Sequence, residues 1–167
     1  DNCYIMVHGH GTQGNVKSGP TQPALEYWRD SHFDQYKNSD FLAYLLGPTD
    51  NYAVVGYDST DESGYPYWRD EAAGEIARQM VSIKQGNGDG YTHDQAGTQC
   101  SANDDFWVVS HSQGAQQMTF MSGNAASGSP YYNTAFNSAG SAVSVPYTQA
   151  FSGVLGVFTL GGAIGGT

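Results

Sequence analysis

The sequence has few positive charges. Six Lys and Arg residues stand against sixteen Asp and Glu residues, so the 167-residue chain has a formal net charge of −10. Nucleic-acid binders gain affinity from cationic contacts with phosphate, and proteins that dock to anionic lipid use basic clusters. The charge balance therefore argues against both functions. Charged residues make up only 13% of the chain, against about 25% in a typical domain, so Gly, Ser, Asn, Gln and Tyr supply most of the polarity.

Long apolar runs and cysteines are also scarce. No stretch approaches the ~20 consecutive apolar residues that a membrane-spanning helix needs, and the length suits one domain, residues 1–167. Cys3 and Cys100 are the only cysteines, a number that suits either one disulfide in an exported protein or two reduced thiols. The chain begins at Asp1 without Met, as it would after removal of a signal peptide. We expect a secreted or periplasmic protein.

Four short apolar runs predict β-strands. They are continuous rather than alternating, which is typical of strands that are covered on both faces of a parallel sheet. Helical patterns separate them: one at 40–46, one from Asp70 to Lys84–Gly86, and one that begins at Ser112–Gly114. This alternation predicts an α/β fold with a mostly parallel sheet. The predicted strands are Tyr4–His8, Tyr52–Tyr57, Phe106–Ser110 and Val154–Leu160.

The stretches between these elements are rich in Gly, Asn, Ser and Asp, and Asp58–Gly64, Gly86–Asp105 and Gly123–Ser144 are predicted to be loops. Gly86–Asp105 is long for a compact domain, and long loops are often functional. Its acidic residues lack the spacing of an EF-hand, so a solvated acidic loop is the favoured interpretation over a calcium site. No metal or cofactor is predicted. The acidic residues are Asp89, Asp94, Asp104 and Asp105.

The most specific segment is Ser110-His111-Ser112-Gln113-Gly114, which joins the third predicted strand directly to a helix. It nearly matches the G-x-S-x-G nucleophile-elbow pattern in its strand–turn–helix context, with Ser110 in place of the first Gly. A nucleophile at the tip of such a turn has a strained backbone, so its neighbours must be small. Gly114 allows the helix to pack close to the strand. The helix would also direct its N-terminal dipole at developing negative charge.

A second segment ends the first predicted strand at His8-Gly9 and continues into a Gly-rich stretch. Such a segment suits an oxyanion hole, because a backbone N–H can approach a substrate carbonyl there without obstruction by side chains. Together the two segments resemble the α/β-hydrolase family, specifically its secreted bacterial lipases and esterases. The resemblance covers nearly the whole chain in order, including Leu160-Gly161-Gly162 at the end of the fourth strand.

This resemblance implies a three-layer fold with helices on both faces of the sheet. It implies that Ser112 is the nucleophile and that the backbone N–H groups of His10 and Gln113 form the oxyanion hole. The substrate would be a carboxylic ester cleaved through an acyl-enzyme, or the same acyl-enzyme would serve an acyltransferase or transpeptidase. Cys3 and Cys100 would lie just before neighbouring strands of such a sheet, which favours a disulfide between them.

The sequence departs from the family after Ser112, where it contains no Asp, Glu or His, although the family places its acid and base there. The favoured explanation is a second polypeptide, a C-terminal fragment of the same precursor, that supplies both residues and completes the sheet. A second explanation is an upstream base, and a third is a non-catalytic binding module. The upstream candidates are His8, His10, His32 and His93, with Asp58 as the orienting acid.

Three other residues close to these motifs are expected to have structural roles. His111 is expected to pack beneath the elbow. Tyr27 and Trp28 follow the Gly-rich segment and could line an acyl pocket, but anchoring a helix is the favoured role for both.

Overall fold

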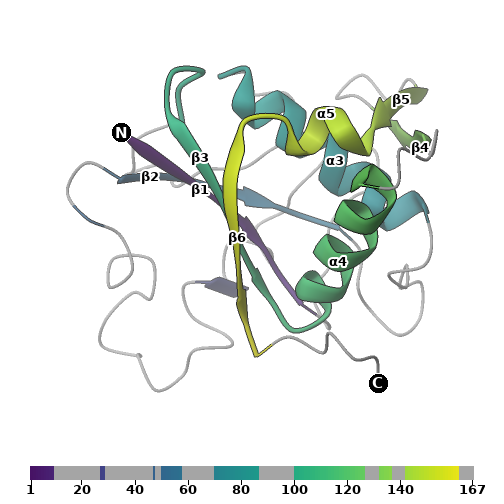
Figure 1. Ribbon diagram of the computed structural model, residues 1–167, viewed down its shortest axis with the longest axis horizontal. Helices are drawn as coiled ribbons and strands as arrows, with labels where there is room; N and C mark the ends of the chain where they lie inside the picture. Colours follow the sequence, from purple (N-terminus) through teal and green to yellow (C-terminus); the bar gives the residue numbers. More distant parts are fainter. Residues whose placement is uncertain are drawn as a thin grey trace.

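Four parallel strands form the central sheet (Figure 1). They are β1 (Asn2–Val7), β2 (Asp50–Val55), β3 (Asp105–His111) and β6 (Val154–Leu160). In this computed structural model the spatial order is β2-β1-β3-β6, and each neighbouring pair is parallel. The prediction of an α/β fold with a mostly parallel sheet is therefore confirmed. The structure describes residues 1–9, 27–28, 47, 50–57, 70–86, 100–126, 132–136 and 142–161.

Three helices pack together beside the sheet (Figure 1). They are α3 (Asp70–Lys84), α4 (Gln113–Ala126) and the short α5 (Tyr147–Phe151). The first two begin where the sequence predicts them, and α3 ends at the predicted lysine. The predicted helix at 40–46 lies outside the described residues, as do Asp58–Gly64 and residues 87–99.

The prediction of a loop over Gly123–Ser144 is wrong. The helix α4 continues to Ala126, and an antiparallel hairpin follows, made of β4 (Tyr132–Phe136) and β5 (Ala142–Pro146). Each of these strands has only five residues and mixes apolar residues with Asn, Thr, Ser or Pro. The continuous apolar run that identified the four strands of the main sheet is therefore missing from both.

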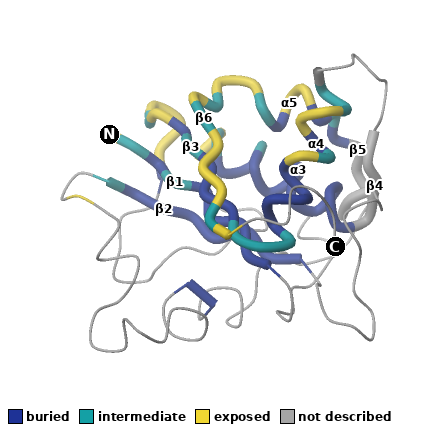
Figure 2. Tube along the Cα trace, turned by 60° about the horizontal axis from the view of Figure 1, so that its bottom comes forward, coloured by how far each residue is buried: buried dark blue, intermediate teal, exposed yellow. Residues whose placement is uncertain are grey.

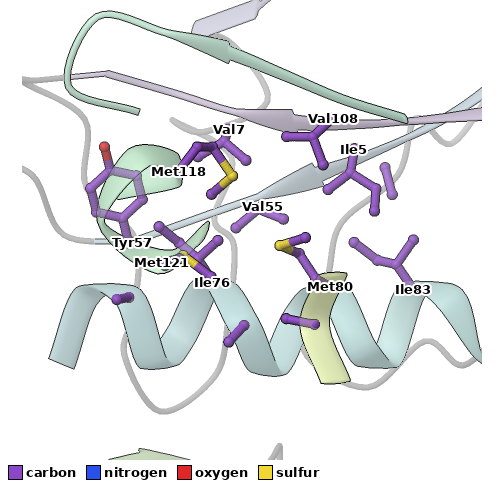
Figure 3. Close-up of a cluster of buried hydrophobic side chains, with 14 of the residues drawn as sticks. Ile5, Val7, Val55, Tyr57, Ile76, Met80, Ile83, Val108, Met118 and Met121 are labelled. Atoms are coloured by element: carbon purple, nitrogen blue, oxygen red, sulfur yellow. The ribbon is translucent and has the colours of Figure 1, made fainter. Parts of the chain in front are cut away.

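The central strands are buried on both faces. Successive side chains of a strand point to opposite faces, and β1 accordingly sends Ile5 and Val7 into one apolar cluster and Met6 into another. The larger cluster lies between the sheet and α3 (Figure 3). The four apolar residues that the helical spacing of α3 places on one face are all buried in this cluster: Ala72, Ile76, Met80 and Ile83. The helix is buried on its other sides as well, and Glu75, Arg78 and Gln79 are almost inaccessible.

The fourth strand, β6, differs from the other three because it is exposed along much of its length (Figure 2). Leu155, Val157 and Phe158 keep 58%, 40% and 50% of their surface accessible. The prediction of a strand covered on both faces is therefore wrong for β6. Within the described part of the chain β6 is an edge strand paired only with β3. The edge position alone does not account for the exposure, because β2 is the other edge strand and is buried.

A disulfide joins the beginning of β1 to the segment that leads into β3. Cys3 and Cys100 are bonded, with their Cα atoms 5.6 Å apart, so the predicted pairing is confirmed. Close by, the Asp105 N–H donates to the Asp1 carbonyl at 2.8 Å. Among the described residues, no helix is long and apolar enough to cross a membrane.

Candidate active site

Both motif segments end at the same place in the sheet. The chain passes from β1 to β2 on one side, and then crosses back to β3 and β6 on the other side of β1. In open α/β sheets, ligands bind at the carboxyl ends of the strands at such a change of direction. Val7 lies opposite Ser110 in the parallel register, so Gly9 and Ser112, which follow two residues later, come together at this edge.

Ser112 occupies a strained turn between β3 and α4. Its φ is 55°, and it is the only non-glycine residue with positive φ in the described part of the chain. The turn is held at both sides, because the Ser112 N–H donates to the Leu160 carbonyl at 3.2 Å and its carbonyl accepts from the Ala115 N–H at 3.0 Å. A left-handed conformation costs an L-residue roughly 1–2 kcal/mol. The strand–turn–helix geometry predicted around Ser112 is therefore present.

Two glycines allow the elements of this site to approach closely. A Cβ atom on Gly114 would lie 2.5 Å from the His8 carbonyl oxygen and 2.6 Å from that of Val7, so the start of α4 rests directly on the end of β1. A Cβ atom on Gly9 would lie 2.7 Å from the Ser112 Cβ. Real Cβ atoms essentially never come within 3.0 Å of a heavy atom outside their own residue and its chain neighbours. Any larger residue at either position would therefore move Ser112 relative to β1.

His8, a candidate upstream base, is fully buried and uses both of its ring nitrogens. Its Nδ1 lies 2.8 Å from the Gly9 carbonyl, and its Nε2 accepts from the Tyr57 N–H at 3.2 Å. Because a carbonyl oxygen only accepts, these contacts assign the proton to Nδ1 and make the imidazole neutral. The Tyr57 hydroxyl donates to the His8 carbonyl at 2.8 Å, and the two rings stack at 4.2 Å. To act as a base for Ser112, His8 would have to break one of its ring hydrogen bonds.

Gln79 fixes the segment of backbone that binds His8. Its amide side chain accepts from the Gly56 N–H at 3.0 Å and donates to the Gly56 carbonyl at 2.8 Å, which fixes the backbone just before Tyr57. Burial raises the pKa of Tyr57 well above its usual value, so this phenol keeps its proton. Gln79 was not predicted from the sequence. The sequence did contain a sign of this role, because Gln79 is a polar residue three positions after Ile76 in the predicted helix, and a buried polar side chain needs hydrogen-bond partners.

Tyr27 and His111 form a contact that was also not predicted from the sequence. The Tyr27 hydroxyl is hydrogen-bonded to His111 Nδ1, and Tyr27 keeps only 1% of its surface exposed. The Trp28 ring lies edge-on to both, with centroids 5.4 Å from Tyr27 and 6.4 Å from His111. Tyr27 and Trp28 belong to the apolar cluster on the face of the sheet opposite α3, and the His111 ring contacts both of them.

The remaining predicted site residues are only partly described. Gln113 is the first residue of α4, and amides in a first helical turn have no acceptor within their own helix. His10, His32, Asp58 and His93 lie outside the described residues, so their proposed roles remain predictions.

The acidic loop is described only around Asp104. One of its carboxylate oxygens accepts from the Ser101 N–H at 2.8 Å and from the Asn51 side chain at 3.0 Å, which closes the turn before β3. Within the described ranges, no group of three or more His, Cys, Asp or Glu side chains is placed to hold a metal ion.

The fold and the site define an α/β protein with a strained serine at the carboxyl edge of a parallel sheet. Comparison of the chain with protein-family models, with curated proteins and with solved structures finds no match.

Proposed function

We propose that Ser112 is the nucleophile of a carboxylic ester hydrolase with an α/β-hydrolase-like arrangement. The observation that carries this proposal is the left-handed backbone of Ser112 at the turn between β3 and α4, next to Gly9. Glycine would adopt this conformation without strain. A serine held there instead, at the edge of the sheet where ligands bind, is best explained by a need for its hydroxyl group.

In the proposed reaction, the Ser112 Oγ attacks the ester carbonyl carbon while a base accepts the hydroxyl proton. The carbonyl oxygen becomes an oxyanion, which the N–H groups of His10 and Gln113 stabilise. Collapse of this intermediate expels the alcohol, which takes the proton from the base, and leaves an acyl-enzyme. Water then attacks the acyl group, releases the acid and returns the proton to Ser112. Transfer of the acyl group to another alcohol or to an amine would make the protein an acyltransferase instead.

In this proposal the base comes from a second polypeptide. Residues 113–167 contain no Asp, Glu or His, and His8 is engaged with Gly9 and Tyr57. We propose that a fragment of the same precursor supplies an Asp and a His and packs against β6. Parallel strands are normally covered on both faces, and an exposed apolar edge is a ready site for another strand. The exposed side chains of Leu155, Val157 and Phe158 on β6 fit this role.

Export is part of the same proposal. The Cys3–Cys100 disulfide needs an oxidising compartment to persist, which supports a secreted or periplasmic location.

A fluorophosphonate probe and intact-mass measurement test the proposed nucleophile. The natively purified protein should gain one phosphonyl group on Ser112, and the Ser112→Ala variant should gain none. The Ser122→Ala variant is the matched control, because Ser122 lies exposed on α4 and its hydroxyl bonds only the Thr119 carbonyl at 3.3 Å. It should react like the wild type.

The same spectra, recorded under native and then denaturing conditions, test the proposed partner. A reactive protein that carries a second polypeptide with an Asp and a His would support both parts of the proposal. Labelling of the 17.9 kDa chain alone would support the nucleophile and refute the second polypeptide. A protein that carries the second polypeptide and still remains unlabelled would refute the assignment of Ser112.

A further inference from the structure

The Tyr27 hydroxyl lies where the two halves of the site meet. A Cβ atom on Gly9 would be 2.6 Å from this hydroxyl oxygen, 2.7 Å from the Ser112 Cβ and 2.9 Å from the His111 carbonyl oxygen. Tyr27 therefore reaches across the end of the sheet and touches both the residue that follows β1 and the turn that follows β3. A hydroxyl buried in an otherwise apolar cluster needs hydrogen-bond partners, and Tyr27 has one on each side.

The direction of these hydrogen bonds follows from their chemistry. A hydrogen bond with the Gly9 backbone lowers the pKa of the Tyr27 phenol. Because a donor stabilises the phenolate oxygen, the Gly9 N–H is the donor in this hydrogen bond. We assign the Tyr27 O–H as the donor to His111 Nδ1, because a buried hydroxyl hydrogen needs an acceptor and Nδ1 is within reach; this assignment places the imidazole proton on Nε2. Burial outweighs the Gly9 contact and raises the pKa of Tyr27 to about 12, so the hydroxyl keeps the proton that it donates.

Gly9 is thereby held through both of its backbone polar groups. Its N–H is bound by Tyr27, and its carbonyl accepts from His8 Nδ1 at 2.8 Å. A trans peptide unit is planar, and its C=O and N–H point in opposite directions. The Gly9 carbonyl belongs to the same peptide unit as the N–H that is the proposed oxyanion donor, so the contacts of Gly9 bear directly on that donor. Since the Gly9 N–H is already bound, it is not available as an oxyanion donor.

We propose that Tyr27 is a positioning residue that sets the separation between the oxyanion donor after Gly9 and the nucleophile Ser112. This inference rests on the proposed function, because it assigns Tyr27 a role within that site. The hydroxyl holds Gly9 through its amide and the Ser112 turn through the ring of His111. Removing it would leave the aromatic packing intact and free both elements to move apart.

The Tyr27→Phe variant tests this role, because it removes the hydroxyl group alone. With a short-chain nitrophenyl ester, kcat should fall about tenfold to a hundredfold, as expected for a misplacement of about 1 Å or less at a reacting centre. KM should stay within about twofold of the wild type, since the hydroxyl is buried and does not reach the substrate. Tyr4→Phe is the matched control, because Tyr4 is packed against the same apolar cluster but lies in β1 five residues before Gly9. It should leave both constants unchanged.

Nitrogen-15 NMR of the histidine rings provides a readout that does not depend on activity. In the wild type at neutral pH, His111 should show a protonated Nε2 and a hydrogen-bonded, unprotonated Nδ1. The Nδ1 resonance should shift in Tyr27→Phe and stay in place in Tyr4→Phe, with His111→Gln used to assign it. A proton on Nδ1 in the wild type would overturn the inference, even if Tyr27→Phe failed to fold.

The two proposals fail in different ways. If Ser112 reacts with the phosphonate but Tyr27→Phe has the same kcat as Tyr4→Phe, the nucleophile stands and the role of Tyr27 is refuted. If Ser112 does not react while the Nδ1 resonance shifts as described, the hydrogen bond is supported but the proposed function, and with it the positioning role, is refuted.

Discussion

The contact between Gly114 and β1 gives the sharpest prediction about how the site is built. An Ala at this position would place its Cβ 2.5 Å from the His8 carbonyl oxygen, so α4 would have to move by at least 0.5 Å to reach even the 3.0 Å limit. Overpacking of this kind costs typically about 1–3 kcal/mol, and the better helix propensity of Ala returns up to about 1 kcal/mol. If the helix propensity returns the full amount, the net loss of stability is about 0–2 kcal/mol.

The same displacement should also lower the activity, because it moves Ser112. A misplacement of about 1 Å at a reacting centre reduces the rate about a hundredfold, so a shift of half that size should reduce kcat/KM about tenfold. The measurements are urea unfolding and the rate of phosphonate labelling at Ser112. Gly123→Ala is the control on the same helix, because a Cβ atom there would meet nothing within 4 Å.

Gly123→Ala should stabilise the protein by about 0.5–1 kcal/mol, since a glycine inside a helix is unfavourable, and should leave labelling unchanged. If Gly114→Ala were as stable and as reactive as Gly123→Ala, the close packing of α4 on the end of β1 would not control the position of Ser112.

Three other predictions follow from the described contacts. Ser112→Ala and Ser112→Gly should both lack turnover, but the Gly variant should be more stable by about 1 kcal/mol, and equal unfolding midpoints would refute the strained turn. Reducing the Cys3–Cys100 disulfide opens a loop with a sequence separation of 97, so the free energy of unfolding should fall by up to about 4.7 kcal/mol; an unchanged melting temperature would contradict this. Lys84→Met removes two hydrogen bonds, of 2.6 and 2.7 Å, to carbonyls at the end of α5, and should cost about 1–2 kcal/mol in urea unfolding. Burial lowers the pKa of Lys84 from 10.5 to about 8. Between these two pH values the unfolded chain binds the Lys84 proton and the folded chain does not, so the free energy of unfolding of the wild type rises with pH. The difference in stability between the wild type and Lys84→Met should therefore grow as the pH rises from about 8 to 10.5.

Much of the fold was predictable because its elements carry local signals. The strands of the main sheet are continuous apolar runs, and α3 repeats Ile76, Met80 and Ile83 on one face. The turn at Ser112 is encoded by small residues next to a strand and a helix. The hairpin β4–β5 gives no such signal, because its short strands contain polar residues among the apolar ones.

The side-chain contacts of the site were less predictable. Tyr27 and His111 are separated by 84 positions, and His8 and Tyr57 by 49, so their pairing depends on the assembled sheet rather than on neighbours in the chain. The sequence made His8 a candidate base because its side chain is titratable. Only the structure shows that its two ring nitrogens hold Gly9 and Tyr57. Exposure of β6 was missed for a similar reason, because an exposed strand and a covered strand can share one composition.

The sheet order also has a consequence for how the protein acquires its structure during synthesis. β1 is made first, yet it lies between β2 and β3, so Asn2 pairs with Asp50 and Asp105. More than a hundred further residues must therefore be synthesised before β1 can form backbone hydrogen bonds along both of its edges. Parallel pairings of such long range form slowly, and the apolar side chains of β1 stay accessible to chaperones in the meantime. Because Cys100 lies just before β3, formation of the disulfide with Cys3 would mark the stage at which β3 comes next to β1.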